Sequence, residues 1–155
     1  MSAADFEVRE LDWADPLGEK LRDDQKAEVS ARYAVEDSEP GPKPTAADIT
    51  SFFVAFDRAT GEAVGCGALR ELDPEHGEVK RMYVAPDRRG SGAATAVLQC
   101  LEQDARERGW TRVVLETGTE QQEAVRFYER EGYTAIPPYG YYIGSPWSLC
   151  YEKVF

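Results

Sequence analysis

A short glycine-rich loop at the start of a helix carries the clearest chemical signal in this sequence. Gly90 and Gly92 lie close together, and from about Ala93 onward apolar residues recur at the spacing of one helical face. Glycine lets backbone N–H groups turn towards a ligand without a side chain in the way. A helix N-terminus adds unpaired donors and partial positive charge. The pattern favours a phosphate or pyrophosphate site, and a simple tight turn is the alternative interpretation.

The residues on either side of this loop predict the elements that hold it. Residues 79–84 have the β-branched, aromatic and apolar character of an interior strand. Pro86 ends this strand because proline has no N–H to donate to a ladder. A long amphipathic helix is predicted from about residue 93 to about residue 108, where Gly109 is a stop signal. The loop therefore lies between a buried strand and a long helix.

The spacing in the loop resembles a family signature. It lacks the Gly-Lys-Ser/Thr of a Walker loop and the spacing of a dinucleotide fingerprint, but Arg89-x-x-Gly92-x-Ala94 matches the Q/R-x-x-G-x-G/A signature of the GNAT superfamily of acetyl-CoA-dependent N-acetyltransferases. Residues 124–133 resemble the second marker of that family, a helix that carries a tyrosine and ends at glycine before an aromatic residue. The resemblance is carried by residues 64–133. It implies acetyl-CoA as co-substrate, without a metal, held by Met82, Tyr83, Val84, Arg89, Gly90, Ser91, Gly92, Ala93 and Ala94.

Acetyl transfer from a thioester to an amine makes three demands on a site. The amine must be neutral, the oxyanion must be stabilised, and the leaving thiolate needs a proton. The resemblance implies that backbone N–H groups of residues 82–84 hold the thioester carbonyl, where this strand splays from its parallel neighbour. It also implies that Tyr128 corresponds to the family tyrosine near the sulfur and acts as the acid. The alternative interpretation of Tyr128 is a core aromatic residue on an amphipathic helix.

Two glutamates are candidates for the base. Glu78 opens the central strand, where some family members carry a catalytic glutamate, and Glu116 ends the neighbouring strand, where its carboxylate would face the cleft. Either glutamate would accept a proton through water or bind a cationic substrate. The alternative interpretation of each is an exposed charge at the end of a strand. Gln121 departs from the family pattern, because relatives often carry Asn there, and this departure places its role in doubt.

The order of predicted elements is β-α-β-β-β-α-β-α-β-β. It predicts an α/β fold with a GNAT-like, mixed and twisted central sheet and helices on both faces, antiparallel at first and parallel across the long helix. The first helical region contains either one helix or two, and residues 36–48, with three prolines, form a loop or flap. Strands are expected at 6–11, 49–56, 63–72, 78–85, 112–116, 133–136 and 149–154, and helices at 16–35, 93–108 and 121–131.

Length and composition bound the class of protein. The 155 residues, 42% hydrophobic and 30% charged, fit one acetyltransferase domain over residues 1–155. No apolar run approaches the roughly 20 residues that span a bilayer, and the start lacks the features of a signal peptide, so we expect a cytoplasmic protein. The three cysteines and the single histidine have no zinc-binding spacing, and the cysteines are interpreted as small core residues: Cys66, Cys100 and Cys150.

Charge bears on the partners. A formal net charge of −11 argues against nucleic acid and anionic membranes and mildly favours a cationic substrate. A basic cluster stands out beside the proposed phosphate site: Lys80, Arg81, Arg88 and Arg89. An aromatic segment at residues 136–147 has three interpretations, which are an amine pocket with cation–π contacts, a homodimer surface and ordinary packing.

These observations predict an N-acetyltransferase. We expect it to move an acetyl group from acetyl-CoA to a primary amine of a small molecule, such as an amino-acid-like compound, by direct attack in a ternary complex. One alternative is transfer to a lysine or N-terminal amine of a protein, which needs an open groove. Another is a non-catalytic acyl-CoA-binding sensor, which would tolerate the loss of Tyr128 and of the two glutamates.

Overall fold

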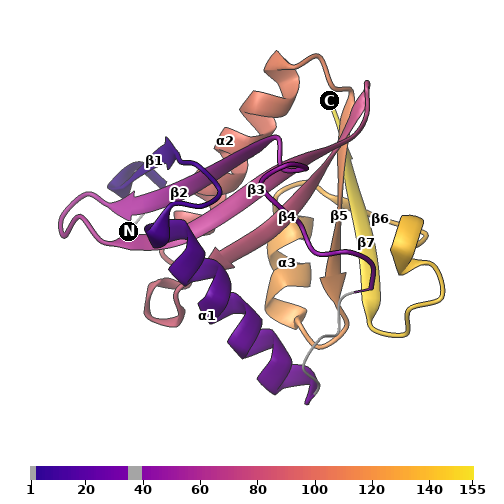
Figure 1. Cartoon of the computed structure of the whole chain (residues 1–155), viewed down its shortest axis with the longest axis horizontal. Coiled ribbons are helices and arrows are strands. Elements are labelled where there is room, and N and C mark those ends of the chain that lie inside the picture. Colours follow the sequence, from indigo (N-terminus) through magenta and orange to yellow (C-terminus); the bar gives the residue numbers. More distant parts are fainter. Residues whose placement is uncertain (1–2, 35–39) are drawn as a thin grey trace.

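The computed structural model describes residues 3–34 and 40–155, and its elements follow the predicted order (Figure 1). The predicted end of the first helix at residue 35 and the start of the proline-containing loop at residues 36–39 lie outside the described residues. Three short 3-10 turns accompany the main elements, at Ala3–Asp5, Pro86–Arg88 and Gly140–Tyr142. The elements are β1 (Phe6–Glu10), α1 (Pro16–Tyr33), β2 (Ser51–Asp57), β3 (Ala63–Asp73), β4 (His76–Val84), α2 (Ala93–Glu107), β5 (Arg112–Gly118), α3 (Gln122–Arg130), β6 (Thr134–Ile136) and β7 (Ser148–Val154).

Within the described residues the strands form one mixed sheet of seven, in the order β1-β2-β3-β4-β5-β7-β6. Strands β1 to β4 pair antiparallel, β4 and β5 pair parallel, and β7 pairs antiparallel with both β5 and β6. The single parallel pair arises because α2 connects β4 to β5, and a helical crossover returns the chain in the same direction. The predicted change from antiparallel to parallel pairing across the long helix is confirmed.

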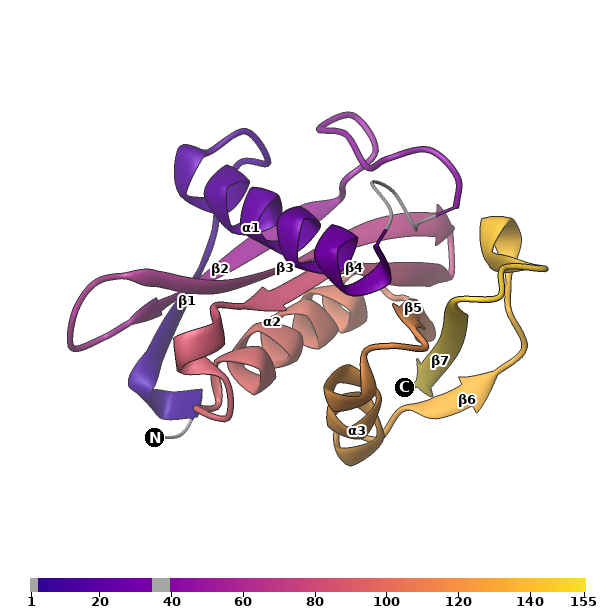
Figure 2. The ribbon, with the colours of Figure 1, turned by 90° about the horizontal axis from the view of Figure 1, so that it is seen from below.

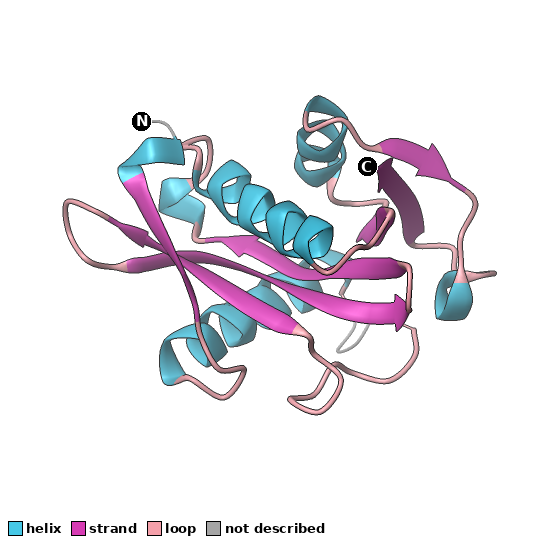
Figure 3. Ribbon diagram, turned by 90° about the horizontal axis from the view of Figure 1, so that it is seen from above, coloured by secondary structure: helices cyan, strands magenta, loops and turns pink. Residues whose placement is uncertain are grey.

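Helices cover both faces of the sheet, as predicted (Figure 3). On one face, Leu21 of α1 packs in a core cluster with Phe52 and Cys66 from the strands. On the other face, Val97 and Leu101 of α2 belong to the larger core cluster, which also contains residues of β4, β5 and α3. Each helix therefore buries one apolar stripe against the sheet, which is the main stabilising contribution in such a layered fold.

The first helical region is one helix and not two. The side chain of Asp15 accepts a 3.0 Å hydrogen bond from the backbone N–H of Leu17, and Pro16 occupies the first turn, where no N–H is required. Lys20 and Asp24, one turn apart, form a 2.8 Å ion pair in the middle part of this helix. The helix therefore continues without a break to Tyr33, whose side chain lies beside Gly118 of β5.

The cysteines differ in burial. Cys66 and Cys150 are buried, as predicted, whereas Cys100 is only half-buried. The core-facing stripe of α2 passes through Val97 and Leu101, and Cys100 lies at the edge of that stripe. No described helix is both long enough and apolar enough to cross a membrane.

Candidate active site

The two central strands separate half-way along their length. The parallel ladder between β4 and β5 joins residues 76–79 to residues 112–115. Beyond Val79 and Leu115 that ladder ends, although β4 continues to Val84 and β5 to Gly118. Figure 2 shows the two parts of the sheet, β1–β4 and β5–β7, on either side of this separation. Beyond Val79, β4 therefore has no ladder partner on β5, which is the splayed arrangement that the family resemblance implied.

A bulge in β4 lies at the point of separation. Cys66 of β3 pairs with Tyr83 and Ala68 pairs with Lys80, so Gly67 alone faces two residues of β4. Arg81 has a positive φ of 57°, which is the left-handed conformation found at bulges and turns. A β-carbon on Gly67 would lie 2.5 Å from the sulfur of Met82. Glycine at this position therefore leaves the space that the bulge needs.

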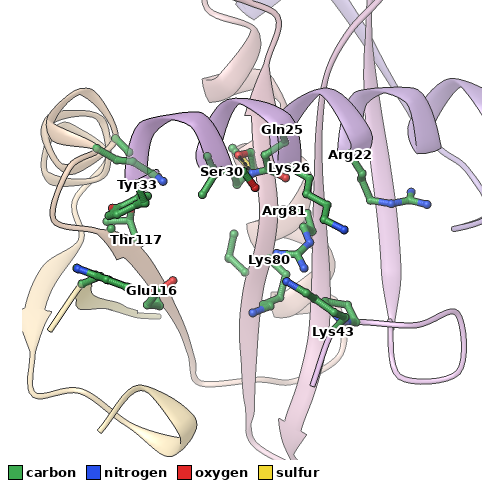
Figure 4. Close-up of a pocket in the computed structure, with 18 of the residues that line it drawn as sticks. Arg22, Gln25, Lys26, Ser30, Tyr33, Lys43, Lys80, Arg81, Glu116 and Thr117 are labelled. Carbon is green, nitrogen blue, oxygen red and sulfur yellow. Dashed lines mark hydrogen bonds between the residues drawn. The ribbon is translucent and has the colours of Figure 1, made fainter. Parts of the chain in front are cut away.

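Two cavities open on the separated strands. The strand cavity, of about 360 Å³, lies between α1 and the ends of β4 and β5 (Figure 4). The loop cavity, of about 570 Å³, runs along the glycine-rich loop, the start of α2 and one side of α3. Because the same side chains line both, the two cavities meet. The shared residues are Gln25, Val29, Met82, Gln121, Ala124 and Tyr128.

The loop cavity has the features of an anion site. Gly90 and Gly92 have φ values of 76° and 98°, which side-chain-bearing residues rarely adopt. Gly92 is the N-cap of α2, so the first N–H groups of that helix open onto the cavity. Ser91 lies off the cavity wall, and its hydroxyl donates to the carbonyl of Arg88. The other residues predicted to bind the cofactor line the cavity: Met82, Tyr83, Val84, Arg89, Gly90, Gly92, Ala93 and Ala94.

The basic cluster of the sequence is divided between the two cavities. Arg88 and Arg89 line the loop cavity, as expected, whereas Lys80 and Arg81 line the strand cavity. Arg89 is held in place by Glu28 of α1, at 2.7 and 2.9 Å, and by the carbonyl of Val84. Their adjacency in the sequence predicted that all four lie beside the proposed phosphate site. In the structure the strands separate, and the bulge in β4 directs Lys80 and Arg81 into the strand cavity instead.

Tyr128 lies where the two cavities meet. Its side chain is buried on α3 against the rings of Phe127 and Tyr133, with ring centroids 5.2 and 5.6 Å away. Its hydroxyl makes no hydrogen bond with any residue in 3–34 or 40–155, so it is available to a ligand. Burial, and secondarily the negative charge of Glu116, raises the pKa of Tyr128 well above its usual range. The hydroxyl therefore keeps its proton at neutral pH.

Glu116 and Glu78 occupy different environments. Glu116 lines the strand cavity and accepts a 2.7 Å hydrogen bond from the hydroxyl of Ser148 on β7. Glu78 is fully buried and lies outside both cavities. It forms a 2.8 Å ion pair with Arg70 and accepts a 2.5 Å hydrogen bond from Tyr139. The structure therefore brings Glu116, and not Glu78, together with Tyr128 at one site.

The sequence analysis missed several residues of the site. Gln25 of α1 lines both cavities, and no local pattern in the sequence indicated it. Arg126 and Arg130 line the loop cavity, and their spacing of one helical turn was a usable signal. Gln121, whose role was in doubt, also lines both cavities, and its side-chain oxygen accepts a 3.0 Å hydrogen bond from Thr117.

Comparison with known proteins identifies the family. The model of the acetyltransferase (GNAT) family matches residues 7–133. The chain belongs to the GNAT family. Over 104 residues it is 40% identical to a protein of Azospirillum brasilense named IAA acetyltransferase, a match that covers 66% of this chain and 66% of that protein's length.

Solved structures agree with this assignment to the GNAT family. An acyl-CoA N-acyltransferase structure from Klebsiella pneumoniae superposes with a TM-score of 0.81 at 27% identity, over 96% of this chain and 97% of the other. A GNAT acetyltransferase of Elizabethkingia anophelis, solved with acetyl-CoA bound, has the same fold with a TM-score of 0.70 at 16% identity, over 97% of this chain and 99% of the other.

Proposed function

We propose that this protein transfers the acetyl group of acetyl-CoA to a primary amine of a small molecule by direct attack in a ternary complex. The observation that carries the proposal is the meeting of the two cavities at Met82 and Tyr128. A thioester entering along the loop cavity and an amine entering along the strand cavity would reach the same point. Holding both reactants there removes much of the entropic barrier to their reaction.

The loop cavity fits acetyl-CoA in three ways. The backbone N–H groups at Gly92 and at the start of α2 suit the pyrophosphate. The side chains of Arg88, Arg126 and Arg130 line the same cavity and add positive charge for phosphate groups. The stretch of β4 beyond Val79 has no ladder partner on β5, and there it would present main-chain groups to an amide-containing chain such as pantetheine. Acetyl-CoA supplies the acetyl group as a thioester.

The residues at the meeting point fit the roles that the transfer requires. Glu116, directly or through a water molecule, takes the proton that the ammonium group must lose. The amine nitrogen then forms a bond to the carbonyl carbon, and the carbon–sulfur bond breaks. Backbone N–H groups of residues 82–84 stabilise the oxyanion, and the hydroxyl of Tyr128 donates a proton to the departing sulfur. The second amine proton, lost as the amide forms, restores the hydroxyl of Tyr128, and Glu116 returns its proton to solvent. The products are the acetylated amine and free coenzyme A.

We assign a positioning role to Glu78. Its carboxylate joins Arg70 of β3 to Tyr139 of the segment between β6 and β7. Burial, together with the charge of Glu78, raises the pKa of Tyr139, so this hydroxyl remains a donor. The role that we propose for Glu78 is to fix the segment before β7 against the central strands.

The shape of the strand cavity supports a small acceptor. Tyr33 of α1 and Trp147 both line it, and their ring centroids are 5.9 Å apart. The ring of Tyr33 also covers Gly118, where any β-carbon would overlap its hydroxyl. These contacts connect α1 to the β5–β7 part of the sheet across the cavity, which leaves less room for an extended peptide than an open groove would.

The direct test is thiol release from acetyl-CoA by the purified protein with a panel of amines. The panel contains amino acids, polyamines, aminoglycosides and short peptides. We expect release with one class of small amine and a higher melting temperature with acetyl-CoA alone. A melting shift without release for any amine would favour the sensor alternative, and release with peptides alone would favour the protein acetyltransferase.

A further inference from the structure

Among the described residues, the lining of the strand cavity carries more cationic side chains than carboxylates. The protein carries a formal net charge of −11, yet only Asp23 and Glu116 contribute carboxylates among the described residues that line this cavity. A concave site with walls of one sign concentrates the field and attracts groups of the opposite sign. The basic residues of the lining are Arg22, Lys26, Lys43, Lys80 and Arg81.

The bulge in β4 creates part of this basic wall. Successive residues of a regular strand point to opposite faces of a sheet, so Lys80 and Arg81 would normally face different sides. The left-handed conformation of Arg81, with φ of 57°, interrupts that alternation, and both side chains line the strand cavity. Two adjacent cationic side chains are thereby directed to one place.

Lys80 is the most buried of these cations. Its residue is 8% exposed, and its ammonium donates a 2.7 Å hydrogen bond to the hydroxyl of Tyr142. The same ammonium lies 5.5 Å from the centre of the Tyr142 ring. A charge held in a partly desolvated wall interacts with an anion more strongly than a charge exposed to water does. An oxyanion beside Lys80 would therefore interact with this ammonium more strongly than with that of an exposed lysine.

The basic groups and Glu116 lie on different sides of the cavity. Figure 4 shows Lys26, Lys43, Lys80 and Arg81 near α1 and β4, and Glu116 with Thr117 and Tyr33 towards β5. An acceptor whose amine is directed to Glu116 and Tyr128 would thus place its remaining groups beside the cations. A volume of about 360 Å³ is at the small end for ligand sites, which suits a compound of amino-acid size.

We infer that the acceptor is a small amine that also carries an oxyanion, as an amino acid carries its carboxylate, and that Lys80 and Arg81 bind this group. The inference rests on the proposed function and narrows its acceptor class. It runs against the expectation from net charge alone, which mildly favoured a cationic substrate. A carboxylate, a phosphonate and a sulfonate share the required chemistry, and the acceptors in the test distinguish them.

The test compares acceptors that differ only in the acidic group. Several amino acids are tested as acceptors at saturating acetyl-CoA, and each is compared with its own carboxamide and with the amine that remains when its carboxylate is removed. Aminoalkyl phosphonates and sulfonates are tested in the same assay. We expect kcat/KM to fall at least tenfold when the acidic group is neutralised or removed. Equal kcat/KM within these sets would overturn the inference while leaving the proposed function in place. Thiol release with none of the acceptors would overturn both.

Variants then locate the oxyanion site. K80Q and R81Q should each raise KM for the acidic acceptor about tenfold and thereby reduce the preference for the acid over its carboxamide. K20Q removes an exposed cation of α1 that lines neither cavity, and it should retain the full preference for the acid. R81Q keeps the test decisive if K80Q is poorly folded, because Arg81 is only half-buried. If R81Q and a folded K80Q both kept the full preference for the acidic acceptor over its carboxamide, Lys80 and Arg81 would not be the oxyanion site.

Discussion

The side-chain amide of Gln25 donates a 2.9 Å hydrogen bond to the main-chain carbonyl of Met82, 57 positions further along the chain. This bond joins α1 to the bulge of β4 at the place where the two cavities meet. The Met82 carbonyl needs this donor because the ladder between β4 and β5 ends at Val79, so β5 supplies no partner for it. The side-chain oxygen of Gln25 is buried and has no partner among the described residues.

Gln25→Leu should therefore affect both stability and turnover. The variant leaves the Met82 carbonyl without its donor, which should cost about 1–3 kcal/mol of unfolding free energy. It also loosens the bulge at which we propose that the thioester binds. We expect a lower kcat/KM in a thiol-release assay and a lower midpoint in urea unfolding. Gln99→Leu, at an exposed position of α2, is the control and should change neither. An unchanged kcat/KM in Gln25→Leu would contradict this role.

Tyr128→Phe should reduce turnover without weakening the fold. Because the hydroxyl has no hydrogen-bond partner among the described residues, its removal leaves no buried group unsatisfied, and we expect an unchanged melting temperature. Loss of the proton donor should lower kcat by about 10²-fold, with little change in the Kd for acetyl-CoA. Tyr141→Phe, at a residue that is 64% exposed, is the matched control. Turnover equal to that of the parent protein would remove Tyr128 from the mechanism.

The two glutamates should give opposite phenotypes when changed to glutamine. Glu116→Gln can still accept the hydrogen bond from Ser148 but cannot take a proton, so it should stay folded and lose most of its kcat. Glu78→Gln breaks a buried ion pair with Arg70 and should cost about 3–5 kcal/mol of stability. Activity at low temperature and the urea midpoint separate the two effects. If Glu78→Gln were stable but inactive and Glu116→Gln were active, Glu78 and not Glu116 would be the base.

Gly92→Val should abolish acetyl-CoA binding more than it destabilises the protein. Valine at a φ of 98° is strained, and its side chain would stand before the N–H groups at the start of α2. Gly61→Val is the control, because Gly61 has a φ of 76°, has open space around it and lines neither cavity. Both variants should lose stability to a similar extent, about 1–2 kcal/mol, whereas only Gly92→Val should lose the melting shift with acetyl-CoA. A normal shift in Gly92→Val would refute the phosphate-loop assignment.

Stability should fall in mildly alkaline solution because of buried groups that resist ionisation. Burial raises the pKa of the Cys66 thiol from 9.0 to about 12, so the unfolded chain loses this proton at a lower pH than the folded protein. The stabilisation associated with the proton is complete below pH 9.0 and decreases as the pH rises towards 12, by about 4 kcal/mol in total. The buried hydroxyls of Tyr128, Tyr133 and Tyr139, whose pKa values burial also raises, add in the same direction.

Urea unfolding between about pH 8 and about pH 11 measures this dependence. Cys66→Ala lacks the thiol and should show a shallower decrease in unfolding free energy over this range, although it starts from a lower value because of the space left behind. Identical slopes for the two proteins would mean that the thiol ionises equally in the folded and unfolded states.

Much of the fold was predictable because it depends on local patterns. Apolar periodicity placed each helix and strand, and Gly109 and Pro86 marked element ends near where they occur. The glycine-rich loop was found from the spacing of its glycines, because backbone conformation and a helix N-terminus are properties of neighbouring residues. The choice between one and two helices in residues 16–33 rested on a capping bond and an ion pair that the periodicity did not reveal.

The sequence by itself determined the order of the elements, the glycine-rich loop before α2 and the position of Tyr128 on an amphipathic helix. The tertiary structure alone decided which side chains meet. A single bulge at Arg81 resets the alternation of β4, and this directs Lys80 and Arg81 to the strand cavity. Packing between segments far apart in the chain buries Glu78 but leaves Glu116 in the lining of the strand cavity. The same kind of packing brings Gln25 to Met82. No local periodicity records such contacts.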